Sequence, residues 1–136
     1  MTHVGKGDPA LDKRLSDELD KYNASATPEV PPAEELTVQV IESGELVAGA
    51  SGWTWGLAAG IGMTWVREDK RGTGLGADLM ASFENEARNR GSAHVFVTSF
   101  TFQAPGFYER LGYREIFRWE SVPTLGRDDV HMRKDL

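Results

Sequence analysis

The 136-residue chain contains no cysteine and no long apolar run. Without cysteine it can form neither disulfides nor thiolate metal sites. Its least polar stretch, Leu46 to Val66, is rich in glycine and broken by polar residues, whereas a membrane-spanning helix needs about 20 mostly apolar residues. The N-terminus also lacks the apolar segment of a secretory signal peptide. We therefore expect a cytoplasmic protein with no membrane association and no metal site.

Basic residues are also in short supply. The chain has 21 acidic and 15 basic residues, which gives a formal net charge of −6. Nucleic-acid binding generally needs a basic surface that displaces counterions, so we exclude nucleic acid as a partner. An acidic surface concentrates cationic ligands and mildly favours a positively charged substrate. The same charge could also serve only to keep the protein in solution.

The spacing of apolar residues predicts a single domain over residues 1–136. Asp8 and Pro9 are typical of a helix start, and apolar residues at helical spacing follow as far as Tyr22. Residues 26–32 contain three prolines and predict a loop. We therefore expect residues 1–32 to form an N-terminal helix and loop.

The remaining pattern predicts an α/β (α+β) fold. An antiparallel meander is expected at residues 36–41, 46–55 and 59–66. Further along the chain we expect a helix at 74–90, a strand at 93–100, a short helix at 105–111, and a closing strand pair at 113–120 and 129–134. This order favours a mixed, mostly antiparallel central sheet flanked by helices. Exposed strands of such a sheet could pair across a homodimer.

The most informative segment joins the third strand to the following helix. Gly72, Gly74 and Gly76 alternate with other residues directly after Arg71. Glycine lets main-chain N–H groups approach a ligand closely, and a helix N-terminus adds unpaired donors and partial positive charge. Arginine adds a permanent cation that suits phosphate. The segment therefore predicts a pyrophosphate site, with a ligand-free tight turn as the plain alternative.

Three kinds of phosphate-binding loop were compared with this segment. A P-loop ends in Gly-Lys-Ser/Thr, but Gly76 is followed by Ala77, which excludes it. A dinucleotide-binding loop is matched by Gly72, Gly74 and Ala77. However, the next strand, which ends at Phe100, lacks the acidic residue that would hold the ribose. A nicotinamide-binding fragment therefore stays an alternative.

The third kind is the Arg-x-x-Gly-x-Gly/Ala loop, matched by Arg71, Gly74 and Gly76. Residues 104–113, which include Tyr108, match a second pattern, Ala-x-x-x-Tyr-x-x-x-Gly-Phe/Tyr. In this order, the two motifs resemble those of the GNAT N-acetyltransferase family. The likeness runs from about residue 36 to the C-terminus.

The run from Thr98 to Tyr108 is most similar to small bacterial, single-domain members of that family. The resemblance implies a GNAT-like fold. It also implies transfer of an acetyl group from acetyl-CoA (coenzyme A), as co-substrate, to a primary amine of a small cationic acceptor. The alternative is a non-catalytic sensor module that binds acyl-CoA, because the strand at 59–66 carries no carboxylate where many relatives place one.

The resemblance also implies which residues contact the cofactor. The pantetheine arm would lie along the strand that ends at Trp65 and Val66, where a main-chain N–H near Val66 would stabilise the oxyanion. Tyr108 matches the position of the general acid that protonates the leaving thiolate, with core packing as its alternative. No residue is assigned as the general base. The residues expected around the pyrophosphate are Arg71, Gly72, Thr73, Gly74, Leu75, Gly76 and Ala77.

Other polar and aromatic residues also suggest possible roles. Trp53 and Trp55 share one strand face and could line an acceptor pocket through cation–π contacts, or simply pack the sheet. His94 and His131 lack the spacing to acidic residues that a metal site needs, so packing or surface roles are expected. Residues 128–129 could meet a cationic acceptor or lie in a solvated turn.

Overall fold

The computed structural model describes all residues, 1–136, and the chain divides into two compact units, 1–33 and 34–136. The first unit holds α1 (Pro9–Ala26). The Asp8 side chain caps this helix by accepting hydrogen bonds from the N–H groups of Ala10 (3.0 Å) and Leu11 (3.2 Å). No residue of α1 is buried, so its apolar stripe is exposed. The helix start is therefore confirmed, while the grouping of 1–32 with the rest in one domain stays a prediction.

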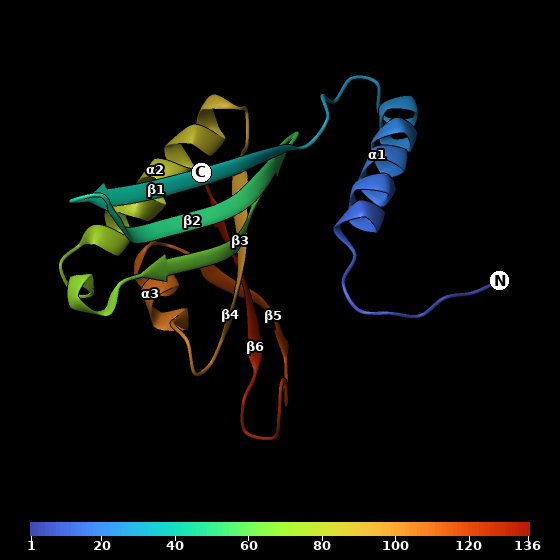
Figure 1. Ribbon diagram of the computed structural model, residues 1–136. Coiled ribbons are helices and arrows are strands. Elements are labelled where there is room, and N and C mark those ends of the chain that lie inside the picture. The colour runs from blue at the N-terminus through green and yellow to red at the C-terminus, as the bar shows by residue number, and fades with distance from the viewer. The chain divides into compact units, whose positions relative to one another are not determined.

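The second unit is built on a six-stranded sheet with the order β1-β2-β3-β4-β6-β5 (Figure 1). Neighbouring strands are antiparallel except for β3 and β4, which are parallel. This confirms the expected mixed, mostly antiparallel sheet. The strands are β1 (Glu34–Glu42), β2 (Glu45–Trp55), β3 (Ala58–Val66), β4 (His94–Phe100), β5 (Arg114–Trp119) and β6 (Asp129–Asp135).

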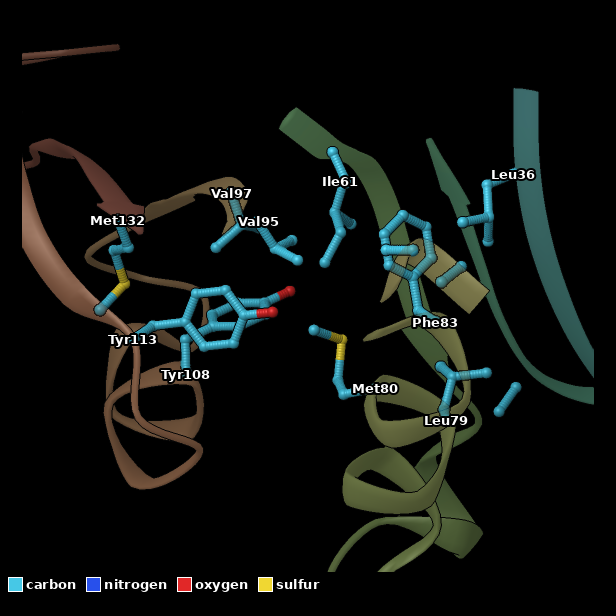
Figure 2. Close-up of a cluster of buried hydrophobic side chains, with 14 of the residues drawn as sticks. Leu36, Ile61, Leu79, Met80, Phe83, Val95, Val97, Tyr108, Tyr113 and Met132 are labelled. Atoms are coloured by element: carbon cyan, nitrogen blue, oxygen red, sulfur yellow. The ribbon is translucent and has the colours of Figure 1, made fainter. Parts of the chain in front are cut away.

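Three helical segments connect these strands: η1 (Glu68–Lys70), α2 (Leu75–Asn89) and α3 (Pro105–Arg110). Helix α2 packs against β1, β2 and β3. Its buried side chains recur every three or four residues, which is the spacing of one helix face. The core that they form with the sheet and α3 is drawn in Figure 2. The buried apolar residues of α2 are Leu79, Met80, Phe83 and Ala87.

One charged cluster lies within this core. Glu84 of α2 is only 4% exposed. Its carboxylate accepts hydrogen bonds from Lys134 Nζ (2.6 Å) and from the Tyr113 hydroxyl (3.2 Å). Burial, followed by the negative charge of Glu84, raises the pKa of Tyr113 above its ordinary value. The phenol therefore stays protonated as a donor, and the cluster ties α2 to β6.

Strands β3 and β4 pair along only part of their length. Their parallel register covers four residue pairs and ends at Ile61 and Val97. Beyond that point β4 continues beside β6, while residues 62–66 of β3 have no partner on the β4 side. The two strands diverge visibly there (Figure 1). The free edge of β3 exposes peptide groups that an extended ligand can pair with.

Strands β1 and β5 form the two edges of the sheet. Pairing of such an edge across a homodimer stays a prediction. None of the helices combines the length and the apolar composition that crossing a bilayer requires.

Candidate functional site

The loop between β3 and α2 makes the glycine-dependent turn that the sequence predicts. Gly72 and Gly74 have φ angles of +75° and +88°, a region that residues with a Cβ atom adopt at a cost. No atom lies within 4 Å of the position that a Cβ would occupy at either glycine. The backbone conformation, rather than crowding, therefore requires glycine here.

Gly74→Ala is expected to lower the free energy of unfolding by about 1–2 kcal/mol, because alanine would be held in the left-handed region. Urea denaturation measures this loss. Gly106→Ala in α3 is the matched control, since Gly106 has no positive φ and the nearest atom to its added Cβ is 3.5 Å away. The control should keep or slightly raise stability. An equal loss in both variants would contradict the assignment of strain to Gly74.

The first turn of α2 leaves main-chain donors without partners in the chain. Its first helical hydrogen bond runs from Asp78 N–H to the Gly74 carbonyl (3.1 Å), and no side chain caps the helix. The N–H groups of Leu75, Gly76 and Ala77 precede that bond and carry the partial positive charge of a helix start. Such a helix end is a ready site for a phosphate group.

Arg71 lies at the entrance to this helix and is exposed. Its Nε donates to the Val66 carbonyl at the end of β3 (3.0 Å), which fixes the direction of the guanidinium group. Arg67 and Lys70, the neighbouring cations, each form salt bridges with acidic side chains. Arg71 forms no salt bridge. The Thr73 hydroxyl donates to the Lys70 carbonyl and so supports the turn.

Gly76 allows α3 to pack closely against the start of α2. A Cβ atom at this position would lie 3.2 Å from the Phe107 ring and 3.6 Å from a Val66 methyl group. Phe107 in turn packs edge-on against Tyr108, with 5.1 Å between ring centroids. This packing links the second sequence motif directly to the glycine loop.

Tyr108 is 7% exposed and lies between two other aromatic rings. Its centroid is 5.6 Å from that of Tyr113, and Figure 2 shows the two rings together with both hydroxyls pointing to the same side. The Ser99 hydroxyl oxygen accepts a hydrogen bond from Ala104 N–H (3.2 Å), which ties the start of α3 to the end of β4. The ring is part of the core, as the packing alternative expects, and its role in proton transfer stays a prediction.

The unpaired part of β3 carries one polar atom that sequence reasoning missed. Thr64 Oγ1 is buried and has no hydrogen-bond partner. Such atoms are rare in folded proteins, and one beside an open strand edge suits a ligand that completes its bonding. Val66 packs against the core, whereas Trp65 points to the other sheet face and is 46% exposed. Strand alternation from Val66 could have placed Thr64 on the inner face.

A second group of polar residues lies on the sheet face opposite α2. His131 Nε2 lies 3.0 Å from Asp129 Oδ2, and Phe96 and Phe117 pack against the imidazole ring. His131 thus has a packing role, as expected, and Asp129 begins β6 rather than lying in a solvated turn. A contact of Asp129 with a cationic acceptor stays a prediction. Residues i and i+2 of one strand share a face, and this signal was available in the sequence.

The tryptophans of β2 lie on this same open face. Trp53 and Trp55 are 40% and 38% exposed. The Trp53 ring lies directly against Gly60 of β3, where any Cβ would clash with it. Sheet packing therefore accounts for Trp53, while a contact of either ring with an acceptor stays a prediction.

The comparison with known families agrees with this geometry. The model of the acetyltransferase (GNAT) domain matches residues 14–136. The chain belongs to the GNAT acetyltransferase family. Acetyl-CoA is the co-substrate of this family. The fold and the family that the two sequence motifs indicated are thus confirmed.

Several GNAT proteins are similar to this chain. Blasticidin-S acetyltransferase from Streptomyces morookaense is 43% identical over 77 residues, which are 54% of each chain. The match thus spans about half the length of that relative. The crystal structure of an acetyltransferase from Bacillus cereus ATCC 14579 has 29% identity and a TM-score of 0.81, covering 99% of this chain and 98% of that one. An aminoglycoside 6'-N-acetyltransferase complexed with coenzyme A shares the fold, with 20% identity, a TM-score of 0.68, and coverage of 98% and 95%.

Proposed function

We propose that this GNAT domain transfers an acetyl group from acetyl-CoA to a primary amine of a small cationic acceptor. The observation that carries the proposal is the position of Arg71, a cation without an acidic partner, next to the uncapped first turn of α2. Both lie where the unpaired edge of β3 ends. A charged end and an open strand edge suit the two parts of coenzyme A, its pyrophosphate and its amide-containing arm.

The cofactor would be held mainly by main-chain groups. Residues 72–77 would bind the pyrophosphate through their N–H groups, together with the Arg71 side chain. The pantetheine arm would pair with residues 62–66 of β3, as an added strand would. The buried hydroxyl of Thr64 lies in that segment and has an unfilled bonding capacity. A main-chain N–H near Val66 would donate to the oxygen that becomes negative during attack on the thioester.

Tyr108 would donate a proton to the departing thiolate. Its ring is fixed on both sides by Phe107 and Tyr113, so the hydroxyl is held in one place without a cost in side-chain entropy during the reaction. Transfer from a phenol to a thiolate is uphill by about 2 kcal/mol in water. That cost is small compared with the barrier of a catalysed step.

The acceptor is proposed to be a small amine for two reasons. The net charge of −6 favours cationic ligands. Two similar proteins are named for blasticidin-S and for an aminoglycoside, both small molecules. These names support the class of acceptor and do not select one compound.

Arg71→Ala is expected to raise the Kd for acetyl-CoA about 10- to 100-fold, since hydrogen bonds to charged groups contribute about 1.5–3 kcal/mol. Isothermal titration calorimetry gives this value directly. Arg88→Ala is the matched control, because Arg88 is an exposed arginine of α2 that bonds only Asn85. The control should bind acetyl-CoA as the unchanged protein does. Equal Kd values for Arg71→Ala and the unchanged protein would argue against the proposed phosphate site.

Release of free thiol from acetyl-CoA separates the enzyme from a sensor. An amine-dependent release with any member of a panel of polyamines, amine-bearing antibiotics and lysine peptides supports transfer. Tight binding of acetyl-CoA without release by any of these amines would instead favour the non-catalytic acyl-CoA-binding module.

A further inference from the structure

The acetyl transfer proposed above needs a group that removes a proton from the acceptor. An alkylamine resembling lysine is almost entirely protonated at neutral pH, and the neutral form costs about 4.6 kcal/mol. No residue of β3 from 58 to 66 carries a carboxylate or an imidazole. A side-chain base on the sheet must therefore come from a strand other than β3.

Two residues of β6 lie across β4, level with the part of the sheet where β3 leaves β4. The β3–β4 pairing ends at Val97, and the next residue of β4, Thr98, is paired with His131. Asp129 is paired with Phe100, two residues further along. Both β6 residues thus lie across β4 from the diverging part of β3, at the level where the thioester end of an arm along β3 would arrive.

Their side chains point to the sheet face opposite α2. Val130 and Met132 are buried in the core with Val97, so the alternating residues of β6 face the other way. The side chains of Asp129 and His131 are 14% and 24% exposed. Both are therefore largely enclosed yet reachable from that face, which lies opposite the helices that frame the cofactor loop.

The two side chains form an oriented pair. His131 Nε2 lies 3.0 Å from Asp129 Oδ2, and a proton on Nε2 leaves the lone pair on Nδ1. The rings of Phe96 and Phe117, at 5.8 Å and 5.3 Å, fix the plane of the imidazole. The second carboxylate oxygen, Asp129 Oδ1, is buried and has no partner. A buried carboxylate oxygen without a donor is costly, so this site offers an unfilled position for a cationic N–H group.

We infer that Asp129 and His131 receive the acceptor amine, with His131 as the general base. This inference rests on the proposed acetyl transfer. The ammonium group donates to Asp129, and one of its protons moves to His131 Nδ1. The neutral nitrogen then forms a bond to the acetyl carbon as the C–S bond breaks. The thiolate takes a proton from the Tyr108 hydroxyl. The nitrogen then gives its second proton to Tyr108, which restores the hydroxyl. The proton on His131 leaves to water, so that one amide, one thiol and one proton are produced.

The charged side chains near Asp129 and His131 have ion-pair partners of their own. On β6, Arg133 is bound to Asp135. On β5, Arg118 is bound to acidic side chains on both sides. The part of β4 next to the pair, residues 95–100, and all of β3 carry no charge. Asp129 is the charged side chain that forms a hydrogen bond and an ion pair with the imidazole.

His131→Gln and Asp129→Asn test the inference. Spermidine, kanamycin, blasticidin S and a lysine peptide are first tested with the unchanged protein. The amine that gives the largest thiol release is then used for the variants. At pH 7, kcat/KM for that amine should fall about 10²-fold in His131→Gln, and about tenfold in Asp129→Asn. The Kd for acetyl-CoA should stay within twofold, which also shows that both variants fold. The difference in kcat/KM between His131→Gln and the unchanged protein should shrink as pH rises toward 10, because an amine that is already neutral needs no base.

His94→Gln is the matched control. His94 lies at the opposite end of β4, where β4 is still paired with β3, and its partner on β6 is Asp135. It should keep the full rate. Wild-type rates across the pH range in His131→Gln would overturn the inference and leave the acetyl transfer standing. A parallel loss at all pH values would overturn the role as a base. Absence of thiol release from the unchanged protein with every amine would overturn both proposals.

Discussion

Replacing Tyr108 with phenylalanine is expected to lower kcat for acetyl transfer by about 10²- to 10⁴-fold, the usual range for loss of a general acid. The substitution keeps the ring that packs against Phe107 and Tyr113 and removes only the hydroxyl. The Kd for acetyl-CoA should therefore hardly change. Steady-state thiol release and calorimetry on the same preparation separate the two quantities.

Tyr113→Phe is the matched control for this prediction. Its ring is adjacent to that of Tyr108, but its hydroxyl is already engaged as a donor to Glu84. This variant should lose some stability and keep kcat within a few-fold. A Tyr108→Phe variant as active as the control would leave Tyr108 with a packing role alone.

Lys134→Met is expected to lower the free energy of unfolding by about 3–5 kcal/mol. The substitution leaves the buried carboxylate of Glu84 without its cation, and breaking a buried ion pair on one side costs about that much. Because small domains are stable by only about 5–15 kcal/mol, the loss should be a large share of the total. The midpoint of urea denaturation measures it.

Two variants make this result specific. Glu84→Gln combined with Lys134→Met removes both charges and should recover part of the loss. Lys13→Met removes an exposed cation that pairs with Asp17 in α1, and it should leave the free energy of unfolding nearly unchanged. A loss below about 1 kcal/mol in Lys134→Met would mean that the cluster is hydrated and contributes little.

The local elements could be predicted because their signals are short-range. Asp8 caps α1 through its own neighbours, and Gly72 and Gly74 adopt the positive φ angles that a tight strand-to-helix turn requires. The apolar spacing of α2 likewise marks its buried face. Each of these features depends on residues within a few positions, so the sequence alone specifies them.

Features that depend on strand pairing could not be predicted in the same way. The divergence of β3 from β4 after Ile61 and Val97 depends on pairing between distant segments. The position of His131 opposite Thr98 depends on such pairing as well. The apolar stripe of α1 shows a further limit. Its helical spacing gave the correct structure, yet none of its residues is buried.

A crystal structure of the protein with acetyl-CoA would show directly where the cofactor binds. We expect pyrophosphate oxygens within hydrogen-bonding distance of the N–H groups of residues 72–77 and of the Arg71 guanidinium. We also expect the pantetheine arm along residues 62–66. Cofactor bound elsewhere on the chain, or none bound at millimolar acetyl-CoA, would contradict the proposed site.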